Sequence, residues 1–347
     1  MAANKSIQFA LAAAALFGAS TPLAKALLGQ LSPWLLAGLL YLGSGVGLVV
    51  IRLARDRGWK HSEMASNEWP WLIGATLFGG LLGPLALMYG LLHTAGATAS
   101  LLLNLEAVLT AVLAWVFFRE HADTRIVLGM IAIVAGGILL SWEAGGGQAT
   151  SWIGPAAVAV ACLCWAIDNN LTRRVSASDA TFIASVKGLV AGSVNTGLAL
   201  AIGTSIPGLE TVAIAMLVGL FGYGLSLILF VLALRGLGTS RTGAYFSTAP
   251  FIGAAIAITF LGDQPSPFFW IAAALMGIGV WLHLTEHHNH EHAHEAFAHH
   301  HRHIHDAHHE HEHMLEGEPE PHAHWHEHQP LIHKHPHFPD IHHRHQH

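Results

Sequence analysis

The sequence contains little charge for its length. Only 11% of the 347 residues are Asp, Glu, Lys or Arg, whereas soluble globular domains carry about 25%. Hydrophobic residues make up 52% of the chain. This composition argues against a water-soluble enzyme and favours a protein with several membrane-spanning segments.

Cysteines and catalytic motifs are also scarce. The two cysteines, Cys162 and Cys164, lie two residues apart and point to different faces of one predicted helix, so we expect core thiols rather than a disulfide. The sequence has no nucleotide-binding loop, no motif for nucleophilic or hydrolytic chemistry and no pattern typical of nucleic-acid binding. We therefore expect a protein that is not an enzyme, requires no cofactor and does not bind nucleic acid.

The charges and the histidines are unevenly distributed. Residues 1–286 hold 13 Lys or Arg and 12 Asp or Glu, whereas residues 287–347 hold 3 and 10. The net charge of −6 therefore arises in the tail, which also holds 25 of the 29 histidines. The chain divides into an apolar body and a polar, histidine-rich tail.

The body contains long apolar runs of the length needed to cross a bilayer. A spanning helix needs about 20 predominantly apolar residues. Ten stretches meet this requirement: 6–28, 34–53, 69–92, 95–118, 125–142, 151–172, 180–203, 211–234, 241–261 and 267–284. We therefore predict an all-α membrane protein with ten transmembrane helices.

The positions of Lys and Arg predict the orientation of these helices. Cytoplasmic connections of membrane proteins are enriched in Lys and Arg. With the N-terminus inside, all the cationic connections are cytoplasmic, and Lys25 is the one cation at the outer ends. This pattern predicts a multi-pass protein of the bacterial inner membrane with both termini in the cytoplasm.

The ten predicted helices divide into two similar sets of five. Sliding the fourth and fifth helices by 143 residues lays Phe117 on Phe260 and Glu120 on Asp263. Because each set has an odd number of spans, the second set has the opposite orientation in the membrane. Inverted repeats are typical of alternating-access transporters, whose substrate site lies near the midplane between the halves.

Several short motifs resemble a known family. They are Phe17-Gly18 followed by Pro22 and Lys25, and the segments Phe118-Arg119-Glu120 and Leu261-Gly262-Asp263, each followed by a Gly-rich helix. In these features residues 6–284 resemble the EamA family of the drug/metabolite transporter superfamily. The resemblance implies a ten-helix permease with a first repeat at 1–148, a second at 149–286 and a disordered tail at 287–347.

One position departs from the pattern of the family. The second half has the helix-entry proline, Pro250, whereas the first half has Ala107 there, directly after Glu106. Glu106 lies 13 residues before Arg119, which is about 20 Å along a helix and places it near mid-membrane. An ionisable group at this depth costs at least about 2.5 kcal/mol. Either the carboxyl binds a cation or a coupling proton, or it is a structural group bonded to a neighbouring backbone.

Other polar residues occur at similar depths in the predicted helices. Asp168 and Lys187 lie at matching depths on two antiparallel helices, so we predict an ion pair that is either structural or part of the transport path. The predicted polar lining of the path is Glu106, Asn104, Asp168, Asn169, Asn170, Lys187 and Asn195.

The tail has a composition typical of disorder and of metal binding. It is rich in His, acids and Pro, and it has no apolar period. Neutral imidazole suits Ni²⁺, Co²⁺ and Zn²⁺, and alternate or fourth residues allow two rings to reach one ion. The predicted metal ligands are His287, His288, His290, His292, His294, His299, His300, His301, His303, His305, His308, His309, His311, His313, His322, His324, His326 and His328.

These observations predict a secondary-active exporter of a divalent transition metal. The sequence is similar to superfamily members with His-rich ends that are associated with nickel and cobalt resistance, which favours Ni²⁺ or Co²⁺, with Zn²⁺ next. Its partners would be the lipid bilayer and the metal ion, and the chain would act as a monomer or a homodimer. One alternative is export of amino acids or other small metabolites, with the tail as a metal-responsive regulator or a pH-sensitive appendage. Another is a membrane-anchored metal store or sensor.

Overall fold

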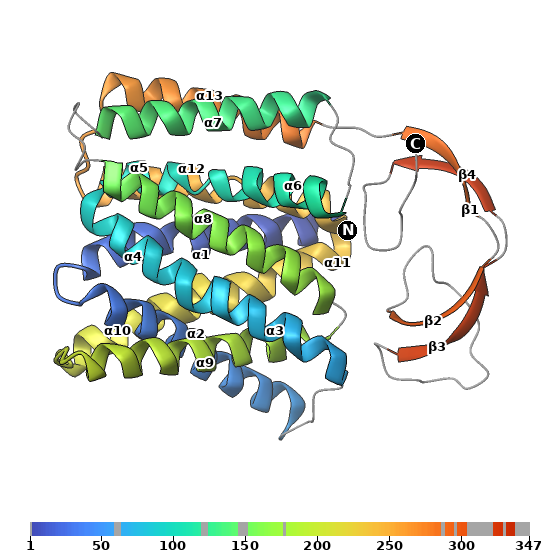
Figure 1. Ribbon diagram of the computed structural model, residues 1–347, viewed down its shortest axis with the longest axis horizontal. Helices are drawn as coiled ribbons and strands as arrows, with labels where there is room; N and C mark the ends of the chain where they lie inside the picture. Colours follow the sequence, from blue (N-terminus) through green and yellow to red (C-terminus); the bar gives the residue numbers. More distant parts are fainter. Residues whose placement is uncertain are drawn as a thin grey trace.

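The computed structural model describes residues 2–58, 64–118, 124–144, 152–175 and 178–285 of the body, and four short segments of the tail. The described part of the body is helical throughout (Figure 1). Its α-helices are α1 (Ala2–Leu27), α2 (Pro33–Asp56), α3 (Trp69–Ala75), α4 (Gly83–His93), α5 (Gly96–Leu102), α6 (Leu105–Phe118), α7 (Thr124–Ala144), α8 (Ile153–Thr172), α9 (Ala180–Ala201), α10 (Leu209–Gly219), α11 (Ser226–Phe246), α12 (Ala249–Phe260) and α13 (Pro267–Leu284). Short 3₁₀ turns, η1 (Ser66–Glu68) and η4 (Arg173–Val175), precede α3 and follow α8.

Eight helical segments are long and apolar enough to cross a membrane: Lys5–Leu27, Pro33–Asp56, Ser66–His93, Gly96–Phe117, Thr124–Trp142, Ile153–Thr172, Ala180–Ala201 and Leu209–Ala233. The last two predicted spans coincide with shorter apolar helices, at Ala249–Phe260 and Pro267–His283. The multi-pass architecture is thus confirmed, whereas the number ten stays a prediction. The connection expected at 235–240 lies inside α11, which has no internal proline to end it.

Two segments of the bundle have π-helical geometry. They are η2 (Thr76–Leu82), between α3 and α4, and η5 (Leu220–Leu225), between α10 and α11. The offset of 143 residues that aligns the two halves lays residues 77–82 on residues 220–225. π-Helical turns are rare and occur frequently at functional sites, because they leave backbone groups without their usual partners.

The fourth predicted span of each half is interrupted. α5 ends at Leu102 and α6 begins at Leu105, while α11 ends at Phe246 and α12 begins at Ala249. α5 packs against α12 and α1, whereas α6, beyond its break, packs mainly against α8. The break between α5 and α6 therefore lies where the neighbouring helices change.

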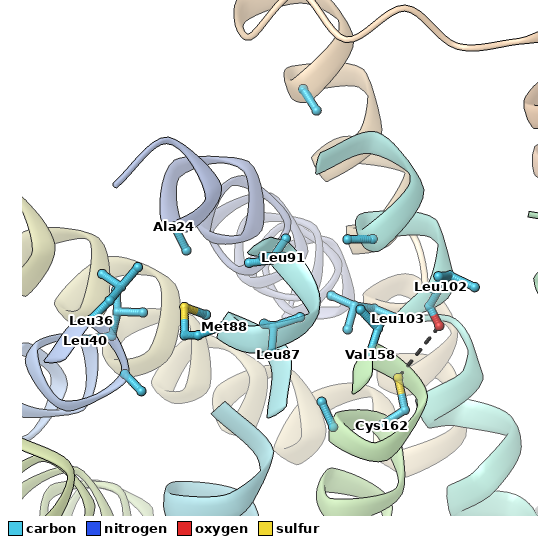
Figure 2. Close-up of a cluster of buried hydrophobic side chains, with 14 of the residues drawn as sticks. Ala24, Leu36, Leu40, Leu87, Met88, Leu91, Leu102, Leu103, Val158 and Cys162 are labelled. Carbon is cyan, nitrogen blue, oxygen red and sulfur yellow. Dashed lines mark hydrogen bonds between the residues drawn. The ribbon is translucent and has the colours of Figure 1, made fainter. Parts of the chain in front are cut away.

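Helices approach most closely where they carry glycine. A Cβ built on Gly188 of α9 would lie 2.6 Å from Cα of Gly45 in α2, so the two backbones touch. Glycine allows this approach because it has no side chain, as in other membrane bundles. The most buried side chains fill the space between α1, α2, α4, α5 and α8, where Cys162 Sγ lies 3.7 Å from the Leu102 carbonyl oxygen (Figure 2). Both cysteines are free and buried, as predicted.

One end of the bundle carries a cluster of charged side chains. The N-terminus and the end of α13 lie at one end (Figure 1), which we call the proximal end, together with Arg52, Arg55 and Asp179. Both arginines contact Asp179, which also accepts a hydrogen bond from the Thr181 amide and so caps α9. Burial alone would raise the pKa of Asp179, but the bonds from the arginines hold this pKa below its usual value. We call the opposite end, with the 94–95 and 261–266 connections, the distal end.

The described tail segments are four strands in two antiparallel pairs. β1 (Asn289–His294) pairs with β4 (Leu331–Pro336), and β2 (Phe297–His303) pairs with β3 (His322–His328). Two-stranded ladders are marginally stable at best in water. Strand pairs of this kind are therefore compatible with a tail that is disordered in water. The disorder that the composition indicates stays a prediction.

Candidate functional site

The break between α5 and α6 places an acidic side chain beside α8. Glu106 is the second residue of α6 and is half-buried. Its Oε1 accepts a hydrogen bond of 2.9 Å from Nδ2 of Asn169, which also lies 3.4 Å from Oγ1 of Thr110. Asn169 is exposed at the surface of the helical bundle. We call Glu106, Thr110 and Asn169 the carboxyl site.

The Glu106 carboxyl group has no cationic partner among the residues that the structure describes. Intramembrane carboxylates are usually paired, or they mark a pathway for ions, protons or substrates. The amide of Asn169 satisfies one oxygen of Glu106 but supplies no charge.

One ring of an aromatic cluster lies one helical turn from the carboxyl site along α8. Trp165 precedes Asn169 by four residues on α8, so both side chains lie on the same face of that helix. The rings of Trp165, Tyr223 and Phe246 lie 6.3, 5.9 and 5.4 Å from that of Phe17, centroid to centroid, and Tyr41 lies 5.4 Å from Tyr223. We call these five residues, from α1, α2, α8, η5 and α11, the aromatic cluster.

The π-helical segment η2 fixes part of this cluster. The carbonyl oxygen of Gly79 accepts hydrogen bonds from Tyr41 Oη at 2.6 Å and from Trp165 Nε1 at 3.0 Å. The carbonyl oxygen of Gly80 accepts one from Asn195 Nδ2 at 3.3 Å. These polar side chains satisfy backbone groups in η2 and hold two of the rings in place.

Asp168 and Lys187 form the predicted ion pair. Lys187 Nζ lies 2.5 and 2.6 Å from the two carboxylate oxygens of Asp168, and Thr172 Oγ1 donates to Asp168 Oδ1 at 2.8 Å. The side chains of Lys187 and Asp168 are only 12% and 11% exposed. The carboxylate packs directly on Gly79, where a Cβ would lie 1.8 Å from Asp168 Oδ2. The pair thus holds α8 and α9 together against η2.

The other three predicted path residues donate hydrogen bonds to backbone carbonyl oxygens. Asn104 donates to the Leu101 carbonyl oxygen and lies 3.9 Å from Met276 Sδ, so it is directed into the bundle. Asn170 donates to the carbonyl oxygens of Ala166 and Thr110. Of the seven predicted path residues, the structure brings Glu106 and Asn169 together and pairs Asp168 with Lys187. Asn104, Asn170 and Asn195 bond to backbone.

Metal ligands do not gather in the described part of the chain. No group of three or more His, Cys, Asp or Glu side chains suited to a metal ion occurs in the described part of the body. This statement does not extend to the tail histidines. His290, His292, His294, His299, His300, His301, His303, His322, His324, His326 and His328 are on described strands without described side chains, and His287, His288, His305, His308, His309, His311 and His313 are outside the described residues.

Sequence reasoning missed the aromatic cluster and Thr110. The rings come from five separate segments, so no local spacing relates them. One signal was present: Gly79-Gly80 and Gly222-Tyr223 are 143 residues apart, at the positions that become π-helical in both halves.

Comparison with known proteins gives the chain its context. The model of the EamA-like transporter family matches twice, over residues 4–142 and 152–285. An uncharacterized transporter from Methanothermobacter thermautotrophicus (strain Delta H) is 29% identical over 284 residues, covering 77% of this chain and 82% of the relative. The uncharacterized transporter YyaM of Bacillus subtilis (strain 168) is 24% identical over 272 residues, covering 75% of this chain and 87% of the relative.

A solved crystal structure has a similar fold. It superimposes with a TM-score of 0.61 at 21% identity, covering 80% of this chain and 94% of that chain. At this identity the similarity extends to the fold alone.

Proposed function

Because the chain belongs to the EamA-like transporter family, we propose that it transports a small organic solute that carries a positively charged amino group and an apolar body. The carboxyl site would bind the charged group, and the aromatic cluster would contact the apolar part. One observation carries this proposal: Glu106 is half-buried, lies at the α5–α6 break and has no cationic partner among the described residues.

The chemistry of the site favours an organic cation over a bare metal ion. Glu106 has an amide and a hydroxyl nearby, which are hydrogen-bonding partners for an ammonium group. The second carboxylate, Asp168, is already neutralised by Lys187. A transition metal would need several ligands from His, Cys or carboxylate side chains at one point, and the searched residues of the body supply no such group.

The aromatic cluster suits the remainder of such a solute. Aromatic faces attract ammonium groups through the ring quadrupole and pack against apolar groups. The rings of Tyr41 and Trp165 are held by η2, so little conformational entropy would be lost when a solute binds. Amino acids and related amines have this combination of groups.

We retain metal efflux as the second candidate function because of the tail. The tail holds 25 histidines and follows α13 at the proximal end, where Arg52 and Arg55 also lie. In this candidate, the tail captures Ni²⁺, Co²⁺ or Zn²⁺ and raises its concentration beside the permease. In the first candidate, the tail is a metal-responsive regulator. We place the proximal end in the cytoplasm, since Lys and Arg are enriched there.

Uptake by proteoliposomes tests the proposal. We would compare the intact chain with Glu106→Gln, which keeps the size and hydrogen bonding of the side chain but removes its charge. Glu210→Gln is the matched control, because Glu210 is exposed at the first turn of α10. Labelled amino acids and apolar amines would be supplied under proton and sodium gradients. We expect gradient-driven uptake that Glu106→Gln reduces at least about tenfold, the effect of about 1.4 kcal/mol of lost binding, and that Glu210→Gln leaves unchanged.

A second experiment, with metal ions, distinguishes the two candidate functions. Cells expressing the intact chain, residues 1–286 or Glu106→Gln would be challenged with Ni²⁺, Co²⁺ and Zn²⁺. Lower metal accumulation with the intact chain, lost on removal of the tail, would replace the first candidate by metal efflux. Uptake of amines that is unaffected by Glu106→Gln would contradict the role of the carboxyl site.

A further inference from the structure

Two charged side chains hold the distal connection between α4 and α5. The Lys25 ammonium group, from the end of α1, donates a hydrogen bond to the carbonyl oxygen of Leu91 near the end of α4. The Asp263 carboxylate, from the loop after α12, accepts a hydrogen bond of 2.7 Å from the Ala97 amide in the first turn of α5. Asp263 and Lys25 also approach Gly96, at 3.4 and 3.7 Å respectively from the position of a Cβ.

These contacts supply what the connection itself lacks. The residue that precedes α5, Ala95, has no side chain that can bond the first amides of the helix. Asp263 satisfies one of these amides from another part of the chain, and its negative charge suits a helix N-terminus. Lys25 likewise bonds a carbonyl at the C-terminal end of α4, where a positive charge is favourable. The pair therefore acts as a capping group for both helices at once.

One of the two contacts, between Asp263 and Ala97, joins different halves of the molecule. Lys25, Leu91 and Ala97 belong to the first family match, whereas Asp263 belongs to the second. Directly beneath them α1, α5 and α12 cross closely. A Cβ on Gly253 would lie 2.7 Å from the Gly18 carbonyl oxygen and 2.8 Å from Ser100 Oγ. The distal end is thus closed by an apolar crossing and by two charged contacts above it.

The first of these interrupted spans has another neighbour on its proximal side. Beyond the break after α5, α6 packs mainly on α8. The carboxyl site lies on α6 and α8, on the proximal side of the crossing, and includes the exposed Asn169. A path from the carboxyl site to the distal end that runs between α5 and α12 would separate these two helices and break the Asp263–Ala97 bond.

We infer that Lys25 and Asp263 form a latch that keeps the distal end closed in this conformation. Opening the latch releases α5 from α12 and exposes the surfaces around Ser100. This also gives a role to Lys25, the one cation that the sequence places at the outer ends of the predicted helices. The inference does not depend on which solute is carried.

The accessibility of an introduced cysteine tests the latch. Ser100→Cys is a nearly isosteric change at a residue that is 1% exposed and lies between α5 and α12. The purified full chain in lipid nanodiscs would react with a hydrophilic maleimide, alone and combined with Asp263→Ala, Lys25→Met or Glu210→Gln. Native Cys162, which is fully buried, reports on general loosening. Its labelling is separated from that of the introduced thiol by peptide mapping.

We expect Asp263→Ala to speed labelling of the introduced thiol about tenfold, which corresponds to the loss of one charge-assisted hydrogen bond. Lys25→Met should have an effect in the same direction, and Glu210→Gln should have none. Labelling of Cys162 should not change in any variant. Equal labelling rates of the introduced thiol in all variants would overturn the latch, and so would a parallel increase at Cys162. Neither outcome bears on Glu106, so failure of the latch is distinguishable from failure of the proposed function.

Discussion

Asp168 and Lys187 form an ion pair in a region where either charge alone would be costly. The two groups contact each other at 2.5 Å, and Thr172 donates a further hydrogen bond. Removing one partner from a buried pair leaves the other charge uncompensated, which typically costs about 3–5 kcal/mol. Because the carboxylate is fully engaged by Lys187 and Thr172, we assign the pair to stability of the bundle rather than to solute binding.

This assignment predicts the outcome of exchanging the two residues. Asp168→Asn and Lys187→Met should each lower the free energy of unfolding by about 3 kcal/mol, measured by denaturant unfolding in detergent. The double variant Asp168→Lys with Lys187→Asp should recover most of the stability and should transport at the parental rate. Recovered stability with no transport would instead place Asp168 in the path.

Some of these contacts could be predicted from the sequence, because the depth of a residue in the membrane can be counted along a helix. Asp168 and Lys187 lie at similar depths on adjacent antiparallel helices, which is sufficient to predict their contact. The same count along the helix placed Glu106 near mid-membrane and made it a candidate site residue. The direction of Asn104 could not be predicted, because the break at residues 103–104 resets the helix phase and directs this side chain toward α13.

At the scale of elements, the π-helical segment η2 is the support of the site. Its carbonyl groups bind Tyr41, Trp165 and Asn195, and Gly79 leaves room for the Asp168 carboxylate. Apolar runs in a sequence predict that a helix exists, and they did so for most spans here. They do not distinguish α from π geometry, because both bury apolar side chains with a similar period. The segments η2 and η5 were therefore not predicted.

Two glycine substitutions test the role of η2. Gly79→Ala should destabilise the protein by about 2 kcal/mol, since the added methyl group overlaps the carboxylate of an engaged ion pair. Gly197→Ala in α9 is the matched control, because nothing lies within 4 Å of its Cβ position and the site is exposed. It should raise stability by up to about 1 kcal/mol. Thermal unfolding of both variants in the same detergent measures the difference, and equal unfolding temperatures would contradict the support role.

At the scale of the whole molecule, the body and the tail are separate in composition and in expected chemistry. The family match ends at residue 285, so the tail lies outside the part that the family shares. This division was predictable from charge and histidine content alone. The composition does not determine the function of the tail, since the same histidines suit capture of a metal, regulation of transport or buffering.

The tail should bind metal in a pH-dependent way. We expect the full chain to bind several Ni²⁺ ions at about pH 7.5, and residues 1–286 to bind none with comparable affinity, by isothermal titration calorimetry. Imidazole must be neutral to bind a metal and has an ordinary pKa of about 6.5. Binding should therefore weaken as the pH falls through about 6.5 and return when it is raised. Equal binding by residues 1–286 would place the metal site in the body.

The π-helical geometry of η2 also has a consequence for insertions and deletions. A π turn holds one more residue than an α turn over nearly the same rise, so the segment carries an additional residue relative to an unbroken α-helix. Deleting one residue between Thr76 and Leu82 would let α geometry run through while α4 keeps its rotation relative to α3, so Leu87 and Met88, now fully buried, would stay in the core. Forcing α geometry on the segment without a deletion would instead rotate α4 by about 100°. The segment can therefore lose one residue without a change in the packing of α4, and the loss would fall on the carbonyl groups that bind Tyr41, Trp165 and Asn195.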